Sequence, residues 1–268
     1  MYLNHKHGSL LELAQSLKSE YQKNVPIPHI VVDDFFKEDF LSSVLDDFSD
    51  LSKENTNVYD NKKENKFAHN NYADWGRPCL ELVHFLNGAE FLGFLQKISG
   101  IPETLISDPY LLGGGKHETK KGGFLKIHTD FNKHSKIDMD RRLNVLVYLN
   151  KNWQDDWGGN FELWDKEVSH CQKTISPKFN RLVVFNTTDV SFHGHPNPLT
   201  CPSSESRKSM AFYYYSVGRS DIKNRVARNT VFVNRKGDKS EPYIWRVQNR
   251  LKHIAKEWIP PILLKVFK

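Results

Sequence analysis

The chain has 268 residues, of which 38% are hydrophobic and 26% charged, a balance that excludes a disordered chain and suits one large domain or one core with attached helical segments. The net charge of +6 is spread along the chain, which favours a basic surface over a nucleic-acid-binding patch. The cysteines Cys79, Cys171 and Cys201 are far apart and odd in number, which argues against a disulfide framework and against a cysteine zinc site.

The sequence also bears on where the protein works. The N-terminal residues contain no long apolar core, so we expect no signal peptide, and no run of about 18 apolar residues predicts a membrane span. With so few cysteines, a reducing cytoplasm is the expected compartment. The apolar, lysine-containing tail over 258–268 is a candidate for peripheral contact with a membrane or a partner, although folding back onto its own domain is the favoured interpretation.

Residues 1–105 are predicted to be mainly helical, with one entry strand. Ser9 is placed to cap a helix that runs to about Lys23, and the residues after Pro26 and Pro28 have the composition of a strand. Apolar residues at helical spacing predict further helices over about 37–51 and over 78–98, the latter broken at Asn87-Gly88 and ended by Gly100.

The polar segment 52–76 between these helices predicts a long surface loop and is a candidate lid over a site.

From about residue 106 short β-rich runs alternate with clusters of Gly, Asn, Asp and Pro. Many short strands at this spacing predict a sandwich or barrel, here a core over 106–219. The predicted strands are 109–113, 124–130, 143–149, 161–164, 181–186 and 208–217. The remaining residues, 220–268, are predicted to be a charged C-terminal extension with a helix over about 244–258.

Two residues of the predicted strand 124–130 carry the central observation. His128 and Asp130 are two positions apart, so their side chains share one face of the strand. His193 follows the apolar strand 181–186 in an expected turn and supplies a third ligand from a distance. Two imidazoles and one carboxylate leave open positions on a metal, an arrangement typical of iron(II) sites used for oxygen chemistry.

Other histidines compete for this role. His195 lies two residues beyond His193. It is an alternative ligand, a residue that supports the ligands from outside, or simply a residue of the turn. His134 follows Asn132-Lys133, which indicates a loop, and is predicted to be exposed to solvent.

A second group of residues is suited to binding a carboxylate. Arg207 lies just before the predicted strand 208–217 and Ser209 lies two positions further on, so their side chains share one face. A guanidinium binds a carboxylate with two parallel hydrogen bonds. Tyr148 is predicted to face inward with Asn144, so its phenol is within reach of the same carboxylate. His117, just before the metal-binding strand, is a candidate lining residue of this pocket.

These motifs occur in a specific order: HTD at 128–130, RLNVLVYLN, GGNFELWD at 158–165, ISPKFNRLVVF at 175–185, His193-Gly194 and RKSMAFYYY. From about Gly122 to Gly218 the chain resembles the catalytic domain of the 2-oxoglutarate/iron(II) oxygenases, in the prolyl-hydroxylase-like branch, and VPIPHIVVDDFF resembles the entry strand of that group. The resemblance implies a mainly β fold with flanking helices, in which a double-stranded β-helix (a jelly roll, cupin-like) packs against N-terminal helices.

The resemblance also implies roles. His128, Asp130 and His193 would hold Fe(II), and Arg207 would bind the distal carboxylate of 2-oxoglutarate with help from Tyr148 and Ser209. The implied reaction uses O2, with ascorbate as an optional further cofactor. It hydroxylates an unactivated C–H bond of a peptidyl (prolyl-like) or small-molecule substrate and releases succinate and CO2.

Three alternatives remain open at this point. A jelly-roll domain without catalysis is a binding module, although it would have little reason to keep the ligand set and Arg207 together. A zinc- or manganese-dependent hydrolase or isomerase would use the same triad without needing Arg207. A nucleic-acid demethylase is motivated by the net charge alone. The sequence indicates no oligomeric state.

Overall fold

The computed structural model describes residues 2–222, 226–236 and 238. Contacts between residues divide the chain into Met1–Val233 and Asn234–Lys268. All the elements described below belong to the first unit, and the divisions predicted at 105 and 219 both fall inside it. In the second unit the described Arg235 and Asp238 form an ion pair of 3.2 Å. The helix predicted over 244–258 and the apolar tail lie outside the described residues.

The predicted helices of the N-terminal part are confirmed. The α-helices of the described chain are α1 (Leu10–Lys23), α2 (Glu38–Asp46), α3 (Arg77–Asn87) and α4 (Ala89–Ser99). Helix α1 begins with the predicted cap, because the Ser9 hydroxyl accepts a hydrogen bond from the Glu12 amide and the Glu12 carboxylate accepts one from the Ser9 amide. Gly100, at a φ of 67°, ends α4 in the left-handed conformation that glycine favours.

Helix α2 is shorter than predicted and ends at Asp46. The next residue, Asp47, uses its carboxylate to accept the backbone N–H of Cys79 and its carbonyl to accept the Lys116 ammonium. These contacts draw the chain away from the helix axis toward α3 and the sheet. Short 3-10 helices occupy other turns: His5–His7, Leu51–Lys53, Tyr72–Asp74 and Asp155–Trp157.

The strands of the described chain form one continuous sheet in which every strand pairing is antiparallel. They are β1 (His29–Asp33), β2 (Asn57–Asp60), β3 (Glu64–His69), β4 (Ile106–Ser107), β5 (Gly115–Lys120), β6 (Phe124–Thr129), β7 (Asp140–Tyr148), β8 (Phe161–Trp164), β9 (Cys171–Ile175), β10 (Arg181–Asn186), β11 (His193–His195), β12 (Ser206–Ser216) and β13 (Val231–Phe232). The order of neighbours is β1-β10-β7-β12-β5-β3-β6-β11-β8-β9, with β2 and β13 added on β3 and β6 and β4 added on β12.

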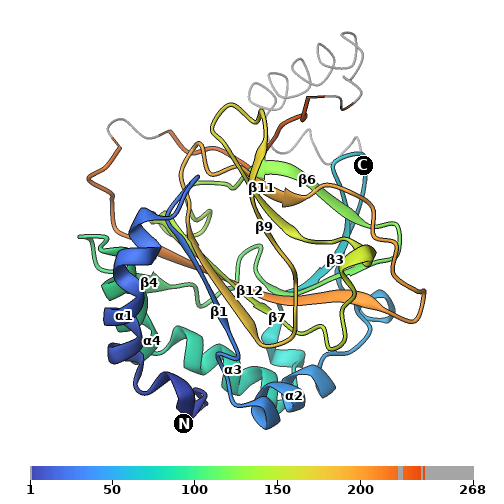
Figure 1. Ribbon diagram of the computed structural model, residues 1–268, viewed down its shortest axis with the longest axis horizontal. Helices are drawn as coiled ribbons and strands as arrows, with labels where there is room; N and C mark the ends of the chain where they lie inside the picture. Colours follow the sequence, from blue (N-terminus) through green and yellow to red (C-terminus); the bar gives the residue numbers. More distant parts are fainter. Residues whose placement is uncertain (1, 223–225, 237, 239–268) are drawn as a thin grey trace, which may run out of the picture. The chain divides into compact units, whose positions relative to one another are not determined.

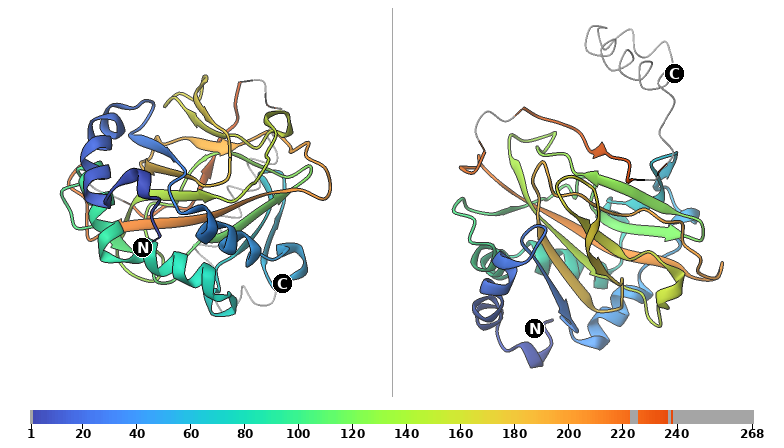
Figure 2. Two further views of the ribbon diagram at one scale, coloured as in Figure 1. Left: turned by 60° about the horizontal axis from the view of Figure 1, so that its bottom comes forward. Right: turned by 45° about the horizontal axis from the view of Figure 1, so that its top comes forward.

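The helices cover one face of this sheet, as Figures 1 and 2 show for α1 to α4 along one side of the strands. Strand alternation explains the arrangement. On β7, Val145 and Val147 belong to the core that the helices share, whereas Asn144 and Leu146 line a cavity on the other face. The helices therefore stabilise one face of the sheet and leave the opposite face available for a site.

The sheet bends back on itself, so that strands far apart in its order meet face to face. Phe161 on β8 and Phe185 on β10 have ring centroids 5.1 Å apart, and both belong to one buried cluster with Tyr148 and Val183. This is the half-barrel of a double-stranded β-helix, packed against N-terminal helices. The predicted fold class is confirmed.

The strand predicted over 109–113 is wrong. The Asp108 carboxylate accepts hydrogen bonds from the backbone N–H groups of Tyr110 and Leu112 at 2.8 and 2.7 Å, and Leu111 and Gly113 have φ values of 44° and 71°. Such a side-chain-stabilised turn is incompatible with an extended strand. The strand lies just downstream, as β5.

The prediction of a plain loop over 52–76 is also wrong. This segment contains the hairpin of β2 and β3, and β3 pairs with both β5 and β6. Phe67 on β3 packs against the main core, while Glu64 and Lys66, on the opposite face, line the cavity. The polar composition reflects a strand with only one apolar contact face, and whether the segment acts as a lid stays a prediction.

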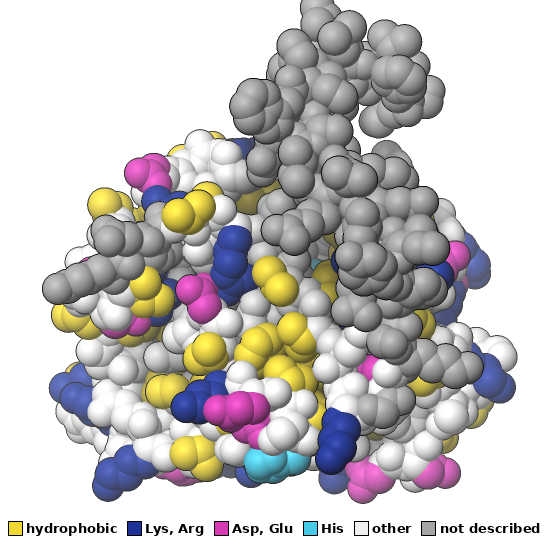
Figure 3. Space-filling view, turned by 90° about the horizontal axis from the view of Figure 1, so that it is seen from above, with side chains coloured by type: hydrophobic (Ala, Val, Ile, Leu, Met, Phe, Trp, Pro, Cys, Tyr) yellow, Lys and Arg dark blue, Asp and Glu magenta, His cyan; other side chains and the backbone are white. Residues whose placement is uncertain are grey.

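The surface adds two further observations. No helix among the described residues is long and apolar enough to cross a membrane, and all three cysteines are free. Figure 3 shows one face of the protein, on which hydrophobic side chains gather near the middle of the described surface and charged side chains of both signs border them. Apolar side chains at the surface are ordinary in folded proteins, so we assign no partner to this face.

Candidate active site

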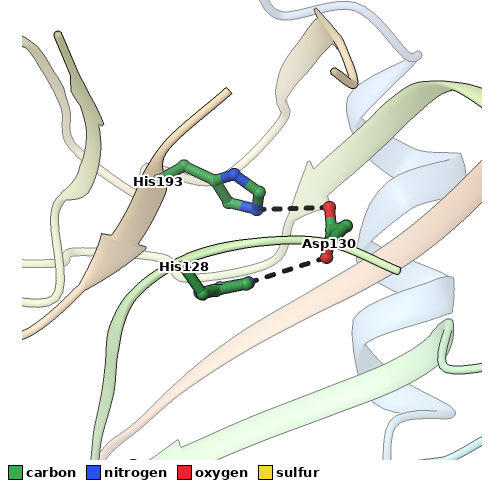
Figure 4. A group of neighbouring side chains, drawn as sticks. All are labelled: His128, Asp130 and His193. Atoms are coloured by element: carbon green, nitrogen blue, oxygen red, sulfur yellow. Dashed lines mark ion pairs between the residues drawn. The ribbon is translucent and has the colours of Figure 1, made fainter. Parts of the chain in front are cut away.

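The structure brings the three predicted ligands together. His128 lies on β6, Asp130 follows the end of that strand, and His193 lies on β11 with its Cα opposite that of His128. One ligand atom from each side chain lies within 4.8 Å of the other two, and the three side chains point toward one another in Figure 4. His193 is therefore in a short strand rather than in the expected turn, and pairing of β11 with β6 is what fixes its position.

Both imidazoles are held so that Nε2 is the nitrogen available to a metal. The Nδ1 of His128 lies 2.8 Å from the Lys126 carbonyl oxygen, and the Nδ1 of His193 lies 2.9 Å from the Ser191 carbonyl oxygen. A carbonyl only accepts, so each Nδ1 carries the proton and each Nε2 presents a lone pair. The two Nε2 atoms face Asp130, at 3.6 Å from its Oδ1 and 3.4 Å from its Oδ2.

The surroundings of the triad favour an ionised Asp130 carboxylate beside a neutral His193 imidazole. Burial alone would raise the pKa of Asp130, but the positive charge of Arg141 and the nearby His193 hold it well below its usual value. Burial lowers the pKa of His193 to about 4. At neutral pH the group thus offers an anionic oxygen donor at Asp130 and a neutral nitrogen donor at His193.

A cavity of about 250 Å³ opens beside the triad. His117, Ser209 and Arg207 all line it, so three of the residues predicted to bind the co-substrate share one wall with the ligands. Strand pairing explains this, since Ser209 on β12 lies opposite His117 on β5 and opposite Tyr148 on β7. The individual roles of these residues stay predictions.

Arg207 is a buried cation without an acidic partner among the described residues. Its Nε donates to the Gly159 carbonyl oxygen at 2.7 Å, and one terminal nitrogen donates to the Tyr148 hydroxyl at 3.1 Å. Its side chain is buried, and no ion pair joins it to an acid in the part of the chain that the structure describes. Burial lowers the pKa of Arg207, but a guanidinium stays protonated in proteins. The arrangement leaves a fixed positive charge facing the cavity.

Gly159 contributes to this site, because its carbonyl oxygen accepts the hydrogen bond from Arg207 Nε. Its φ is 72°, and a Cβ atom here would approach the Arg207 Cδ to 3.0 Å and the Leu199 side chain to 2.7 Å. The turn and the close approach to Arg207 both require glycine. A Gly-Gly pair before a strand predicts a turn, but it does not predict the contact with Arg207.

His195 and His134, the competing histidines, do not belong to the group of three ligands. His195 is buried and lines the cavity, and its Nδ1 has no hydrogen-bond partner among the described residues. His134 is not exposed as predicted. Its Nε2 lies 3.2 Å from Asp108 Oδ1 and its Nδ1 accepts from the backbone of Lys136 and Ile137, so it joins two loops in the interior.

Sequence reasoning missed part of the cavity wall. Tyr59 and Lys66 line it from the hairpin of β2 and β3, and Thr230 and Phe232 line it from the segment after the core. Phe232 pairs with His128 across β13 and β6, and their ring centroids are 5.3 Å apart. A two-residue strand in a charged extension leaves no periodic signal, so only the structure could find it.

The enclosed histidines predict how stability depends on pH. Burial lowers the pKa values of His29, His117 and His193, to about 3 for His117 and about 4 for His193. Between these values and the usual value of 6.5, the unfolded chain binds more protons than the folded one, so folding stability is complete above about pH 6.5 and is lost as the pH falls. Each imidazole contributes up to about 1.4 kcal/mol per pH unit in that window.

Urea unfolding of the metal-free protein at pH 7 and pH 5 measures this effect. We expect a clear decrease in the free energy of unfolding at pH 5, a pH above the range in which most carboxylates titrate. Equal stability at the two pH values would contradict the burial of neutral imidazoles.

Comparison with known proteins places this geometry in context. The family model of the 2OG-Fe(II) oxygenase superfamily matches residues 115–215, a span that contains the triad, Tyr148, Arg207, Ser209 and His117. Mouse prolyl 3-hydroxylase OGFOD1 is 27% identical over 201 residues, which are 71% of this chain and 33% of that protein. The chain thus spans about a third of the length of this relative.

Two solved structures have a similar fold. The Pseudomonas putida prolyl-4-hydroxylase has a TM-score of 0.53 and 16% identity, covering 78% of this chain and 100% of its own. A prolyl hydroxylase of Trichoplax adhaerens, solved with a peptide fragment of the hypoxia inducible factor oxygen degradation domain, has a TM-score of 0.54 and 18% identity, covering 77% of this chain and 90% of its own. At these identities the likeness concerns the fold.

Proposed function

We propose that the chain is a member of the 2OG-Fe(II) oxygenase superfamily, whose family model matches residues 115–215, and that it is an iron(II)- and 2-oxoglutarate-dependent hydroxylase acting on prolyl residues of a peptide or protein. The single observation that carries this proposal is that two imidazole Nε2 atoms and a carboxylate from separate positions in the chain converge in a cavity that is also lined by a buried arginine with no acidic partner among the described residues.

The donor set fits iron(II). His128, Asp130 and His193 supply two nitrogens and one oxygen, the set that leaves several positions of a six-coordinate ion open for ligands from solution. The backbone carbonyls of Lys126 and Ser191 fix both imidazoles with Nε2 free, and such outer hydrogen bonds are usual for metal-binding histidines. A cysteine ligand, which would favour zinc, does not occur in the group.

The cavity also contains residues that suit the binding of 2-oxoglutarate. Arg207 would bind the distal carboxylate, because its guanidinium is charged, buried and already oriented by Gly159 and Tyr148. Ser209 and His117 line the same wall, and Ser209 is placed to donate a further hydrogen bond. His117 is neutral, since burial lowers its pKa to about 3, so it offers hydrogen bonds to a ligand without adding charge.

When bound, iron(II) and 2-oxoglutarate supply the oxygen chemistry that hydroxylates a C–H bond and releases succinate and CO2. The chain binds and orients the two reactants and keeps bulk water away from them. Phe161, Phe185 and Leu146 line the cavity near His193, and their apolar side chains lower the amount of water that reaches the reacting groups.

A prolyl substrate in a peptide is supported by the relatives. The mouse relative is a prolyl 3-hydroxylase, and one of the structures of similar fold contains a bound peptide fragment. Tyr59 and Phe232 line the cavity, and their aromatic side chains suit contact with a pyrrolidine ring.

The proposal is tested in two steps. Adding 2-oxoglutarate to the anaerobic iron(II) protein should produce a visible charge-transfer band, and admission of O2 should then release succinate. Incubation with a library of proline-containing peptides, followed by mass spectrometry, should reveal a mass gain of one oxygen atom on proline. Tight zinc binding, no band and no succinate would favour a metal-dependent hydrolase and contradict the proposal.

A further inference from the structure

Two neighbouring side chains contact the same oxygen of the Asp130 carboxylate. Asn144 donates from Nδ2 to Asp130 Oδ2 at 2.8 Å, and a terminal nitrogen of Arg141 lies 3.1 Å from the same oxygen. Arg141 also donates from Nε and from that terminal nitrogen to Asn144 Oδ1, at 2.9 and 2.8 Å. Hydrogen bonds and one ion pair therefore connect the three side chains to one another.

The position of Arg141 is fixed from several sides. Its side chain is 1% exposed, and its guanidinium carbon lies 3.4 Å from the ring centroid of Tyr213 and 4.4 Å from that of Phe131. Its second terminal nitrogen is buried and has no hydrogen-bond partner among the described residues. Burying such a group is costly for folding, which points to a role beyond stability.

Asn144 and Arg141 both contact the same oxygen of the carboxylate. Asp130 Oδ2 accepts a hydrogen bond from Asn144 at 2.8 Å and forms an ion pair of 3.1 Å with Arg141, and His193 Nε2 lies 3.4 Å from it. No hydrogen bond of 3.5 Å or less joins Oδ1 to a residue in the described part of the chain, and Oδ1 faces His128. The two oxygens of this carboxylate are thus chemically unequal before any metal binds.

We propose that Arg141 and Asn144 are positioning residues that hold Asp130 so that it binds the metal through Oδ1 alone. This inference rests on the proposed function. Binding through one oxygen leaves three positions of a six-coordinate ion open, which a chelating keto acid and O2 together require. A carboxylate free to rotate would bind through both oxygens and close one of those positions. Asn144 and Arg141 exclude that arrangement by occupying Oδ2.

The experiment measures affinity for Mn²⁺, a probe that needs no turnover, from the electron paramagnetic resonance signal of the free ion. We expect Arg141→Met and Asn144→Ala each to weaken Mn²⁺ binding by about 10- to 100-fold, the range for groups that orient a metal ligand. Arg141→Lys should recover part of the affinity, because an ammonium keeps the charge but not the second hydrogen bond.

Arg142→Met is the matched control. Arg142 is the next residue, is equally buried, and bonds Glu103 and Ser216 on the other face of the strand. Its loss should lower the melting temperature and leave Mn²⁺ affinity unchanged. If Arg141→Met does not fold, Asn144→Ala carries the test, since it removes a smaller side chain.

The outcomes separate two failures. If the native protein binds no Mn²⁺, the proposed function fails. If it binds Mn²⁺ and the Arg141 and Asn144 variants bind equally well, or if Arg142→Met weakens binding as much as they do, the positioning role fails and the proposed function stands.

Discussion

Replacing Asp130 by alanine should abolish metal binding and 2-oxoglutarate turnover together. Asp130 supplies the only anionic oxygen of the group formed with His128 and His193, and without it the two imidazoles are left beside the positive charge of Arg141, which repels a divalent cation. The loss should exceed the ~10- to 100-fold expected for residues that only orient a ligand. Mn²⁺ affinity and succinate release measure the two effects separately.

Asp138→Ala is the control for this variant. Asp138 lies in the loop that follows the same strand, and its side chain is 89% exposed in an ion pair with Lys133. Exposed pairs contribute little, so metal affinity and turnover should stay at the native level. Full turnover in Asp130→Ala would refute the proposed ligand set.

Replacing Arg207 by methionine should raise the KM for 2-oxoglutarate by about 100-fold while metal affinity stays unchanged. Removing one partner of a buried, hydrogen-bonded charge pair costs about 3 kcal/mol, and each 1.4 kcal/mol corresponds to about tenfold in binding. The folded protein itself should tolerate the change, because Arg207 has no acidic partner among the described residues and methionine avoids burying its charge.

Lys208→Gln gives the comparison for Arg207→Met. Lys208 is the next residue on β12 and faces the other way, where its ammonium contacts Ser206 and Glu118. Succinate formation measured over a range of 2-oxoglutarate concentrations should show a native KM for this variant. A native KM in Arg207→Met would show that the co-substrate carboxylate binds elsewhere.

Much of the fold was predictable because local signals agreed with the final packing. The Ser9 cap, Gly100 and the apolar spacing of the N-terminal helices are local features. The strands 161–164 and 181–186 were predicted with the observed limits, because each is a short apolar run bounded by turn residues. The inward face of β7 followed from alternation alone.

Most of the failures come from contacts that join distant residues, and one comes from a local turn held by a side chain. Strand β3 is polar because its stability comes from pairing with β5 and β6, and the turn at 109–113 depends on the Asp108 side chain. His134 is buried because Asp108 lies beside it. The charged residue Arg141 at the start of an apolar strand is the one sequence signal for the contact with Asp130. The spacing of the residues does not identify Asp130 as the partner of Arg141.

A crystal structure with Mn²⁺ and 2-oxoglutarate tests the central claim most directly. We predict one metal ion bound by the Nε2 atoms of His128 and His193 and by Asp130, with the distal carboxylate of 2-oxoglutarate on the Arg207 guanidinium. A metal ion bound away from these three side chains, or a 2-oxoglutarate carboxylate that does not contact Arg207, would contradict the account.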